Sequence, residues 1–265
     1  MQHRLISLAP SNTEILFALG AHSSIVGATH LCDFPPEAKR LPKIGSWTTS
    51  HDFDAMERLK PTLLLASMYV PPSLEKWAAQ KRIPLFSVCP VTLDGIYKSI
   101  EKIGSIVGMG ENCTEENCTE ENAKSLVLQM KSDFAKIEAH SKSLAFHPKI
   151  YCEEFHSPPF ASANWVPEIV RLAGGIPFSK EGIFSHPTSL KKLQNFSPDL
   201  IVLHWCGFGE RSAASSLAKR DGWGSLSAVQ GKKIFPFDDS LLNRPSPRLV
   251  LGAQKLQQLI IRHQN

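Results

Sequence analysis

The strongest candidate for a reactive residue in this sequence is a single cysteine thiol. Cys206 lies between Trp205 and Gly207, directly after an apolar run that indicates a buried strand. A cysteine at a strand end can bind a metal or act as a nucleophile, although a buried, unreactive thiol is the commoner use of the residue. Cys32 and Cys152 also follow or end expected strands, so the three thiols are candidates for one shared site.

Carboxylates fall near the same strand ends and would be the partners of such a thiol. Glu153 ends one expected strand, and Asp239 follows another. An enzyme could use Cys206 with either of them, but no recognised nucleophile–base motif accompanies these residues. We expect one of the adjacent Glu153 and Glu154 to face a ligand; the alternative is that both only form the polar end of a strand.

Four histidines suggest a metal site but lack its spacing. A helical zinc site places two histidines four positions apart on one face, and the candidate histidines show no such pair. We therefore expect these histidines to lie at the surface with their hydrogen-bonding groups satisfied, and to bind no metal. The four are His30, His51, His156 and His204.

Large aromatic side chains also fall where strands are expected to end. They are Trp47, Tyr69, Trp165 and Trp205. A large flat ligand gains most from aromatic faces combined with a few polar contacts at its rim. A tryptophan is as readily a residue of the core, so both interpretations stay open at this point.

The composition describes a globular protein and excludes several classes of site. The chain has 265 residues, of which 42% are hydrophobic and 20% charged, and a net charge of +4. So small and dispersed a charge argues against a nucleic-acid partner. The six cysteines form no CxxC pair, which argues against structural zinc, and a disulfide framework is equally unsupported. A tandem repeat over residues 111–120 indicates an acidic surface segment.

Strands that alternate with helices must position these residues. An opening strand over Arg4–Leu8 leads straight into a helix, which predicts a chain with no signal peptide and no transmembrane span ahead of its first core strand. Further strands are expected at Ile25–Ala28, Thr62–Ala66, Ile83–Val88, Lys149–Glu153, Leu200–His204 and Lys233–Phe237. Short apolar runs between helical patterns predict an α/β fold with mostly parallel sheets.

Helix ends also carry recognisable signals. Ser11 and Glu14 have the spacing of a capping box, and Gly20 follows the last apolar residue, where a helix needs a left-handed cap. Near the C-terminus, Ser246 is expected to cap a helix that begins with Pro247.

The middle of the chain interrupts the alternation and divides it in two. Residues Asn122–Leu144 contain no proline or glycine and carry one apolar face, which predicts a helix about 33 Å long. On either side of it, Met56–Leu65 and Leu193–Val202 share one plan, a short helix, a proline stop and a buried strand. We therefore expect lobes at 1–121 and 146–265, joined by a helix at 122–145.

Several segments, taken in order, resemble the cobalamin-binding branch of the periplasmic-type substrate-binding proteins, the BtuF-like group of ABC transporter components. The segments are Arg4–Gly20, Cys32–Glu37, Leu59–Pro61, Pro158–Ser162, Leu172–Gly175 and Asn243–Arg248. Their order and spacing extend the resemblance over nearly the whole chain. It implies two Rossmann-like lobes joined by one long rigid helix, with a ligand in the cleft between the lobes and little hinge motion.

The resemblance also implies a non-enzymatic binding protein for a corrinoid such as vitamin B12, or for another metal chelate such as haem or a siderophore. No cofactor and no catalytic residue would be required. By position, the family's ligand-facing residues would be Trp47 and Tyr69 in the first lobe and Trp205 and Asp239 in the second. Glu153, Trp165 and Cys206 complete the expected ligand-binding set because they fall near expected strand ends. The alternatives are an intracellular cofactor-handling protein or enzyme that uses Cys206 with Glu153 or Asp239, and a metal-ion carrier.

Two departures from the family concern delivery of the ligand. Members of the family dock on a membrane permease through one surface glutamate from each lobe. Glu75 matches the first glutamate, but Lys191 stands in place of the second, and a lysine repels a basic docking pocket. The second departure is that the sequence, as it stands, shows no export signal. We therefore expect the protein to dock weakly on a permease. It would be cytoplasmic as the sequence stands, or periplasmic if a leader precedes this start. We also expect a monomer.

Overall fold

The computed structural model describes residues 3–46, 50–108, 119–212 and 214–263. Contacts between residues divide the chain into two compact units. Unit 1 comprises Met1–Pro90 and Asp94–Gln129, and unit 2 comprises Val91–Leu93 and Met130–Asn265. Trp47 and most of the tandem repeat at 111–120 lie outside the described residues. The expectations for them, and the lobe boundaries at 121 and 146, stay predictions.

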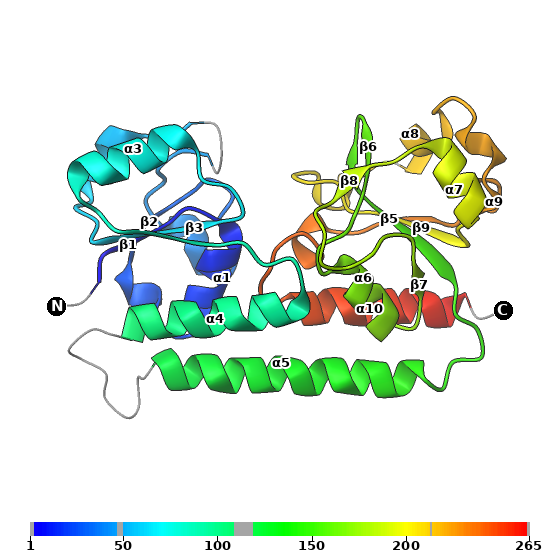
Figure 1. Cartoon of the computed structure of the whole chain (residues 1–265), viewed down its shortest axis with the longest axis horizontal. Helices are drawn as coiled ribbons and strands as arrows, with labels where there is room; N and C mark the ends of the chain where they lie inside the picture. Colours follow the sequence, from blue (N-terminus) through cyan, green and yellow to red (C-terminus); the bar gives the residue numbers. More distant parts are fainter. Residues whose placement is uncertain (1–2, 47–49, 109–118, 213, 264–265) are drawn as a thin grey trace. The chain divides into compact units, whose positions relative to one another are not determined.

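Unit 1 is built on a four-stranded, fully parallel sheet in the order β2-β1-β3-β4 (Figure 1). Its strands are β1 (Leu5–Ser7), β2 (Ile25–Ala28), β3 (Leu63–Ser67) and β4 (Leu85–Val88). All four lie where the sequence predicted strands. Every residue of β1 and β3 is buried, because a parallel sheet has helices on its faces and its central strands need apolar side chains on both sides.

Helix α1 (Pro10–Ala18) begins earlier than its sequence signal suggested. The expected capping box is wrong: the N-cap is Ala9, no side chain caps the helix, and Ser11 and Glu14 are buried within it. Proline is favoured at the first helical position because it has no N–H to leave unpaired. The other end is as predicted, since Gly20 follows the helix with a φ of +75°.

Further helices of unit 1 are η2 (Pro36–Arg40), α2 (Phe53–Arg58), α3 (Pro72–Lys81), α4 (Leu93–Gly108) and the first part of α5 (Thr119–Ser141). Helix α5 is the long helix predicted over 122–144, starting and ending three residues earlier. Helix α4, which the sequence analysis did not identify, packs closely on α5. An added Cβ at Gly104 would come within 2.5 Å of the Ala123 Cβ, so this contact needs glycine.

Unit 2 contains a mixed six-stranded sheet in the order β10-β9-β5-β6-β8, with β7 also paired to β5. The strands are β5 (Lys149–His156), β6 (Pro159–Ala161), β7 (Ile176–Pro177), β8 (His186–Pro187), β9 (Leu200–Leu203) and β10 (Ile234–Pro236). The pairs β10–β9, β9–β5 and β5–β7 are parallel, whereas β6 is antiparallel to β5 and β8. The sequence missed β6, β7 and β8 because strands of two or three residues that contain proline show no alternation.

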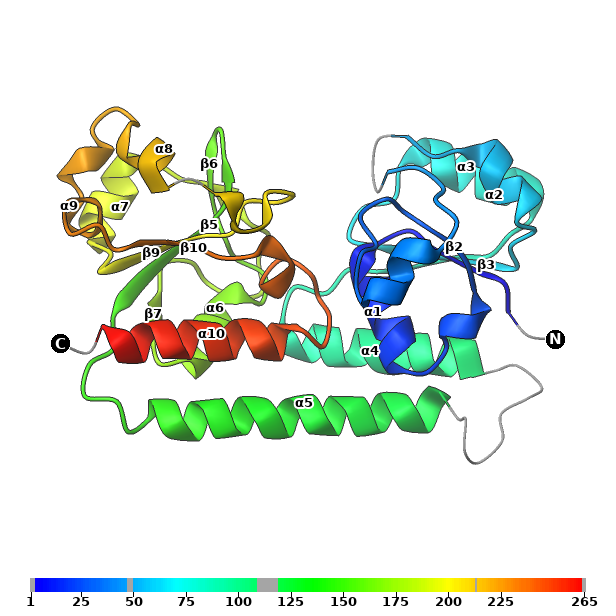
Figure 2. The same cartoon turned by 180° about the vertical axis from the view of Figure 1, so that it is seen from behind.

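The helices of unit 2 are the second part of α5 together with α6 (Val166–Leu172), α7 (Leu190–Phe196), α8 (Ala214–Ala218), α9 (Ser227–Gln230) and α10 (Leu249–Arg262). The expected start of α10 at Pro247 is wrong. The helix begins two residues later, at Leu249, after a turn in which the Ser246 carbonyl accepts the N–H of Leu249 at 3.2 Å. The Ser246 hydroxyl oxygen accepts the N–H of Arg248 at 3.3 Å, so the expected capping residue does bind a backbone N–H there. Helix α10 lies along the second part of α5 (Figure 2). The Gln257 amide donates to the Ile137 carbonyl of α5 at 2.7 Å.

No helix among the described residues combines the length and the apolar content needed to cross a bilayer.

The two sheets share one parallel arrangement, β2-β1-β3-β4 in unit 1 and β7-β5-β9-β10 in unit 2. The strands of the internal repeat, β3 and β9, occupy equivalent places, and each follows a short helix, α2 or α7, as the repeat predicts. We call the end at which the parallel strands of a unit finish its carboxyl edge. Ligands of α/β proteins bind beyond this edge, so we expect the ligand-contacting residues of each unit there.

Candidate functional site

Tyr69 stands exposed at the carboxyl edge of unit 1, directly after β3. The residue is 53% exposed, and its N–H donates to the Ser67 carbonyl at 2.8 Å across Met68, whose φ is +65°. The Met68 N–H donates in turn to the Val88 carbonyl at 2.8 Å, which ties this tight turn to β4. Non-glycine residues rarely adopt a positive φ, and such strain persists mainly at functional sites.

The loop after β2 presents two further apolar side chains at the same edge. Leu31 and Phe34 are both exposed. Between them, Cys32 is buried, with its Sγ 3.2 Å from the Thr29 Oγ1. Cys32 is therefore an interior residue of unit 1, whereas Cys152 and Cys206 belong to unit 2.

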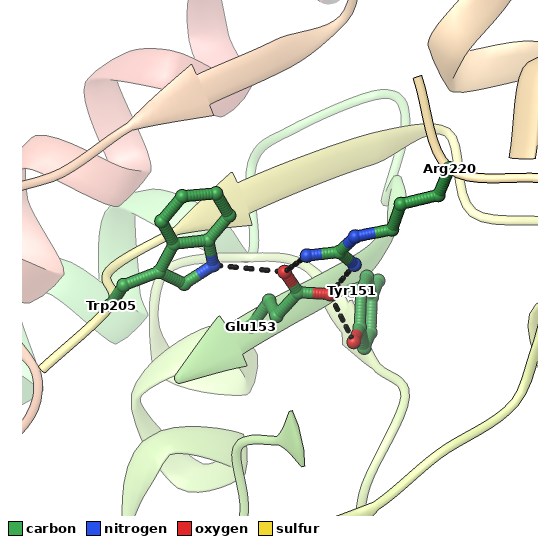
Figure 3. Close-up of polar contacts among 4 residues, drawn as sticks. All are labelled: Tyr151, Glu153, Trp205 and Arg220. Carbon is green, nitrogen blue, oxygen red and sulfur yellow. Dashed lines mark hydrogen bonds and ion pairs between the residues drawn. The ribbon is translucent and has the colours of Figure 1, made fainter. Parts of the chain in front are cut away.

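Glu153 is the centre of a buried polar network in unit 2 (Figure 3). Arg220 donates to both carboxylate oxygens at 2.7 Å. The Trp205 Nε1–H donates to Oε1 and the Tyr151 hydroxyl donates to Oε2, each at 2.8 Å. The Arg220 guanidinium also lies 4.6 Å from the centre of the Trp223 ring. The network joins β5 to the segment after β9 and to the segment after α8.

Burial sets the protonation of two side chains on β5. Desolvation and the neighbouring Glu153 carboxylate raise the pKa of the Tyr151 hydroxyl well above its usual value, so the hydroxyl keeps its proton and continues to donate. Burial alone raises the pKa of the Cys152 thiol to about 12. Cys152 is thus an unreactive core cysteine rather than part of a reactive site.

Three residues that the sequence analysis expected to contact a ligand are interior in the structure. Glu153 has no exposed surface, and Trp165 and Trp205 are each 3% exposed. The Trp165 Nε1–H donates to the Leu242 carbonyl at 2.8 Å, so both indoles have partners inside the protein. Their contact with a ligand stays a prediction. A position after a strand does not determine whether a tryptophan faces outward or inward, because the chain can turn either way there.

Cys206 is an exposed residue whose thiol is held by its neighbours. The Asn243 Nδ2 donates to Sγ at 3.0 Å, and Sγ lies 3.8 Å from the Glu154 Oε1. Desolvation, followed by the carboxylates of Glu154 and Asp239, raises the pKa of this thiol to about 12. A thiol that keeps its proton at neutral pH is a poor nucleophile, which removes the support for an enzyme built on Cys206.

His204 is buried, contrary to the expected surface position. The Ser162 Oγ lies 2.7 Å from its Nε2, and the Asn243 Oδ1 pairs with its Nδ1. Because the Asn243 amide donates to the His204 carbonyl, its oxygen must accept, so Nδ1 carries the proton and Nε2 accepts from Ser162. Desolvation lowers the pKa of His204. The order serine, histidine, asparagine resembles a catalytic triad, but a hydroxyl on so buried a residue has no access to substrate.

Asp239 holds the loop that follows Cys206. The N–H of Gly207 donates to Oδ2 at 3.0 Å and the N–H of Gly209 donates to Oδ1 at 2.8 Å. Both glycines have positive φ, and the intervening N–H of Phe208 donates to the Trp205 carbonyl at 3.0 Å. The observed role of Asp239 is to shape this loop, and its contact with a ligand stays a prediction.

Phe184 is an exposed aromatic residue of unit 2 that the sequence analysis missed. It is 61% exposed, and its neighbour Ile183 is exposed as well. Ser185 fixes the base of this loop, donating to the Glu154 carboxylate and accepting the N–H of Ala163 at 3.1 Å. The loop therefore lies by the end of β5. The sequence signal that could have identified this loop is the apolar pair Ile183 and Phe184 between Gly182 and Ser185.

No three histidine, cysteine, aspartate or glutamate side chains gather into a metal-binding group within the described ranges. The two residues considered for docking are both exposed, Glu75 in the first turn of α3 and Lys191 at the start of α7.

Comparison with known proteins gives one consistent result. The family model described as "Periplasmic binding protein" matches residues 5–241. An uncharacterised ABC transporter substrate-binding lipoprotein of Bacillus subtilis, YvrC, is 28% identical, with 97% of this chain and 79% of that protein covered. A vitamin B12-binding protein of Vibrio cholerae is 24% identical over 96% of this chain and 87% of its own length. The solved structure of the periplasmic haem-binding protein BhuT with two haems has a TM-score of 0.81 at 19% identity, covering 99% of each chain, which supports the fold.

Proposed function

This chain belongs to the periplasmic binding protein family, and we propose that it binds a flat metal chelate, a corrinoid or a haem, for an ABC transporter. The observation that carries the proposal is the exposure of aromatic side chains at both carboxyl edges. Tyr69 in unit 1 and Phe184 in unit 2 are the two principal residues. Each is presented by a fixed piece of backbone, a hydrogen-bonded turn or a loop held by Ser185.

Further exposed apolar side chains near each of the two residues suit the face of a large ring. Leu31 and Phe34 add apolar surface beside unit 1's edge, and Phe155 adds it at the end of β5. Stacking on an aromatic face contributes about 0.5–1.5 kcal/mol beyond the apolar area buried. Relatives named as vitamin B12-binding and haem-binding proteins favour these two chelates over smaller ligands. The protein would need no cofactor of its own, because the chelate is its cargo.

Titration of the purified protein with aquocobalamin and with haemin tests the proposal. We expect one of them to bind saturably, followed by the visible absorbance of the ligand and by calorimetry. A ferric siderophore forms a third arm. Binding of the siderophore alone would overturn the flat-ring proposal while keeping a chelate as ligand, and no binding in any arm would overturn the ligand class.

Delivery to a permease is the second part of the proposal. The names of relatives include a lipoprotein and periplasmic proteins, so we propose a site of action outside the cytoplasmic membrane. Glu75, exposed in the first turn of α3, would contact a basic surface of a permease. Lys191 cannot do so from unit 2, and we infer that native docking is weak.

A further inference from the structure

The ammonium group of Lys43 holds the loop that follows β2. Its Nζ lies 3.0 Å from the Cys32 carbonyl oxygen, 3.1 Å from that of Ala38 and 3.3 Å from that of Thr29. An ammonium group has three N–H donors, so each donor has one carbonyl partner. All three carbonyls belong to residues with at most 1% exposure.

Lys43 reaches this loop from a fixed segment. The N–H of Ala28 donates to the Pro42 carbonyl at 2.9 Å, and the N–H of Ile44 donates to the Ala28 carbonyl at 3.1 Å, which pairs the Lys43 backbone with β2. Two of the three carbonyls also accept a backbone N–H, from Cys32 and from Leu41. The ammonium fills their second acceptor position, as a bound cation would.

We infer that Lys43 is a positioning residue for ligand binding, whose ammonium acts as a built-in cation that shapes the loop over residues 29–38. This inference rests on the proposed function. Leu31 and Phe34 stand exposed on the same loop whose interior carbonyls converge on Nζ. The ammonium is directed at neutral carbonyls inside the loop, so its part in binding is to fix the apolar surface rather than to contact the ligand.

Replacing Lys43 by methionine removes the three donors and keeps an unbranched chain of similar length. We expect the dissociation constant for the chelate that the native protein binds, haemin or aquocobalamin, to rise at least tenfold, equivalent to about 1.4 kcal/mol. Lys39 is an exposed lysine of η2, next to the end of this loop, and Lys39→Met, the matched control, should stay within twofold of the native affinity.

Hydrogen exchange provides a readout that needs no ligand. The amides of Cys32 and Ala38 donate within the loop, to Thr29 and Pro35, and exchange of such amides reports local opening. We expect Lys43→Met to accelerate their exchange at least tenfold and to leave amides of β4 unchanged. If this variant does not fold, Lys43→Gln, which keeps two donors without a charge, takes its place.

Rescue by a small cation separates the inferred role from general destabilisation. Lys43→Ala leaves room for methylammonium, which has three N–H donors, and this ion should restore slow exchange and affinity. Tetramethylammonium at the same concentration has no donor and should restore neither. Native exchange and affinity in Lys43→Met, or a lower melting temperature with unchanged affinity, would overturn the inference. If the native protein binds no chelate, the proposed function is wrong, and so is the role of Lys43 in ligand binding. The exchange and rescue results would then still decide whether Lys43 shapes the loop.

Discussion

Arg220 and Glu153 form a two-point ion pair, in which each of two guanidinium nitrogens lies 2.7 Å from a different carboxylate oxygen. The Glu153 side chain has no exposed surface and that of Arg220 is 17% exposed. Two-point pairing fixes direction as well as distance. The pair therefore holds the segment after α8 against β5 and fixes the Trp205 indole through the same carboxylate.

We predict that Glu153→Gln destabilises unit 2 by about 3 kcal/mol, because it leaves the largely buried Arg220 charge without its counter-ion. The variant and the native protein would be compared by denaturant unfolding. Glu57→Gln is the control, since Glu57 pairs with Lys81 at the surface and an exposed pair contributes about 0–1 kcal/mol. Equal loss in both variants would contradict a special role for the buried pair.

The exposed aromatic residues give a prediction about affinity. Tyr69→Ala and Phe184→Ala should each weaken chelate binding by about 1 kcal/mol, the contribution of one stacking contact. Tyr69→Phe should retain binding if the ring stacks, and lose it if the hydroxyl contacts the metal. Phe146 is also exposed but precedes β5, at the opposite end of that strand from Phe184, so Phe146→Ala should leave the titration curve unchanged.

His204 should make stability depend on pH. Its pKa is lowered in the folded protein by desolvation, whereas the unfolded chain has an ordinary pKa near about 6.5. Above this value both states are neutral and no effect arises. As the pH falls below it, the unfolded state binds a proton that the folded state refuses, so stability falls by up to about 1.4 kcal/mol per pH unit.

Urea unfolding at pH 7.5, 6.5 and 5.5 measures this dependence. His204→Gln should flatten the profile over this range, whatever its effect on stability at pH 7.5. The comparison of slopes isolates His204 from the other histidines, which titrate in both proteins. An unchanged slope in the variant would show that His204 is protonated equally in both states.

The sequence predicted the fold well because its signals are local and repeated. The apolar runs of β1, β3, β5 and β9 are strands, and the repeat of a short helix, a proline and a strand matches equivalent positions in the two sheets. The antiparallel strand β6 was missed because three residues carry no periodicity. The α1 cap was mistaken because a proline start and a capping box compete over the same few positions.

The site was less predictable, because a residue type near a strand end does not determine the direction of its side chain. Trp205 was expected to stack on a ligand, yet its Nε1–H faces a carboxylate from a strand about fifty positions away. Such long-range pairing has no local signal. An alanine at Trp205 should therefore act mainly through loss of packing and of the Glu153 contact. Tyr69 is exposed on a turn that directly follows a strand, and its contact with a ligand stays a prediction.

Cys206 gives a prediction that distinguishes binding from thiol chemistry. With its pKa at about 12, alkylation by iodoacetamide at pH 8 should be at least about 100-fold slower than that of N-acetylcysteine, because only the thiolate reacts. Peptide mass spectrometry would follow Cys206 separately from the other cysteines. Glu154→Gln removes one of the carboxylates that raise the pKa and should speed the reaction. Alkylation at the rate of a free thiol would instead support the alternative in which Cys206 is a reactive cysteine.

The final prediction concerns the surface that would meet a permease. Glu75 and Lys191 are both exposed on helices, but only the glutamate can attract a basic pocket. A single exposed ion pair contributes about 0–1 kcal/mol, too little to hold two proteins together. We therefore expect the native protein to associate weakly or not at all with a vitamin B12-type permease in nanodiscs.

Lys191→Glu should strengthen this association severalfold, because it replaces repulsion by attraction at the position of the second contact. Lys192→Glu makes the same change of charge on the neighbouring exposed residue of α7 and serves as the control for net charge alone. A gain shared by both variants would indicate long-range steering rather than a specific contact. Tight association of the native protein that is lost in Glu75→Ala would contradict weak docking, and would mean that unit 2 uses a contact other than residue 191.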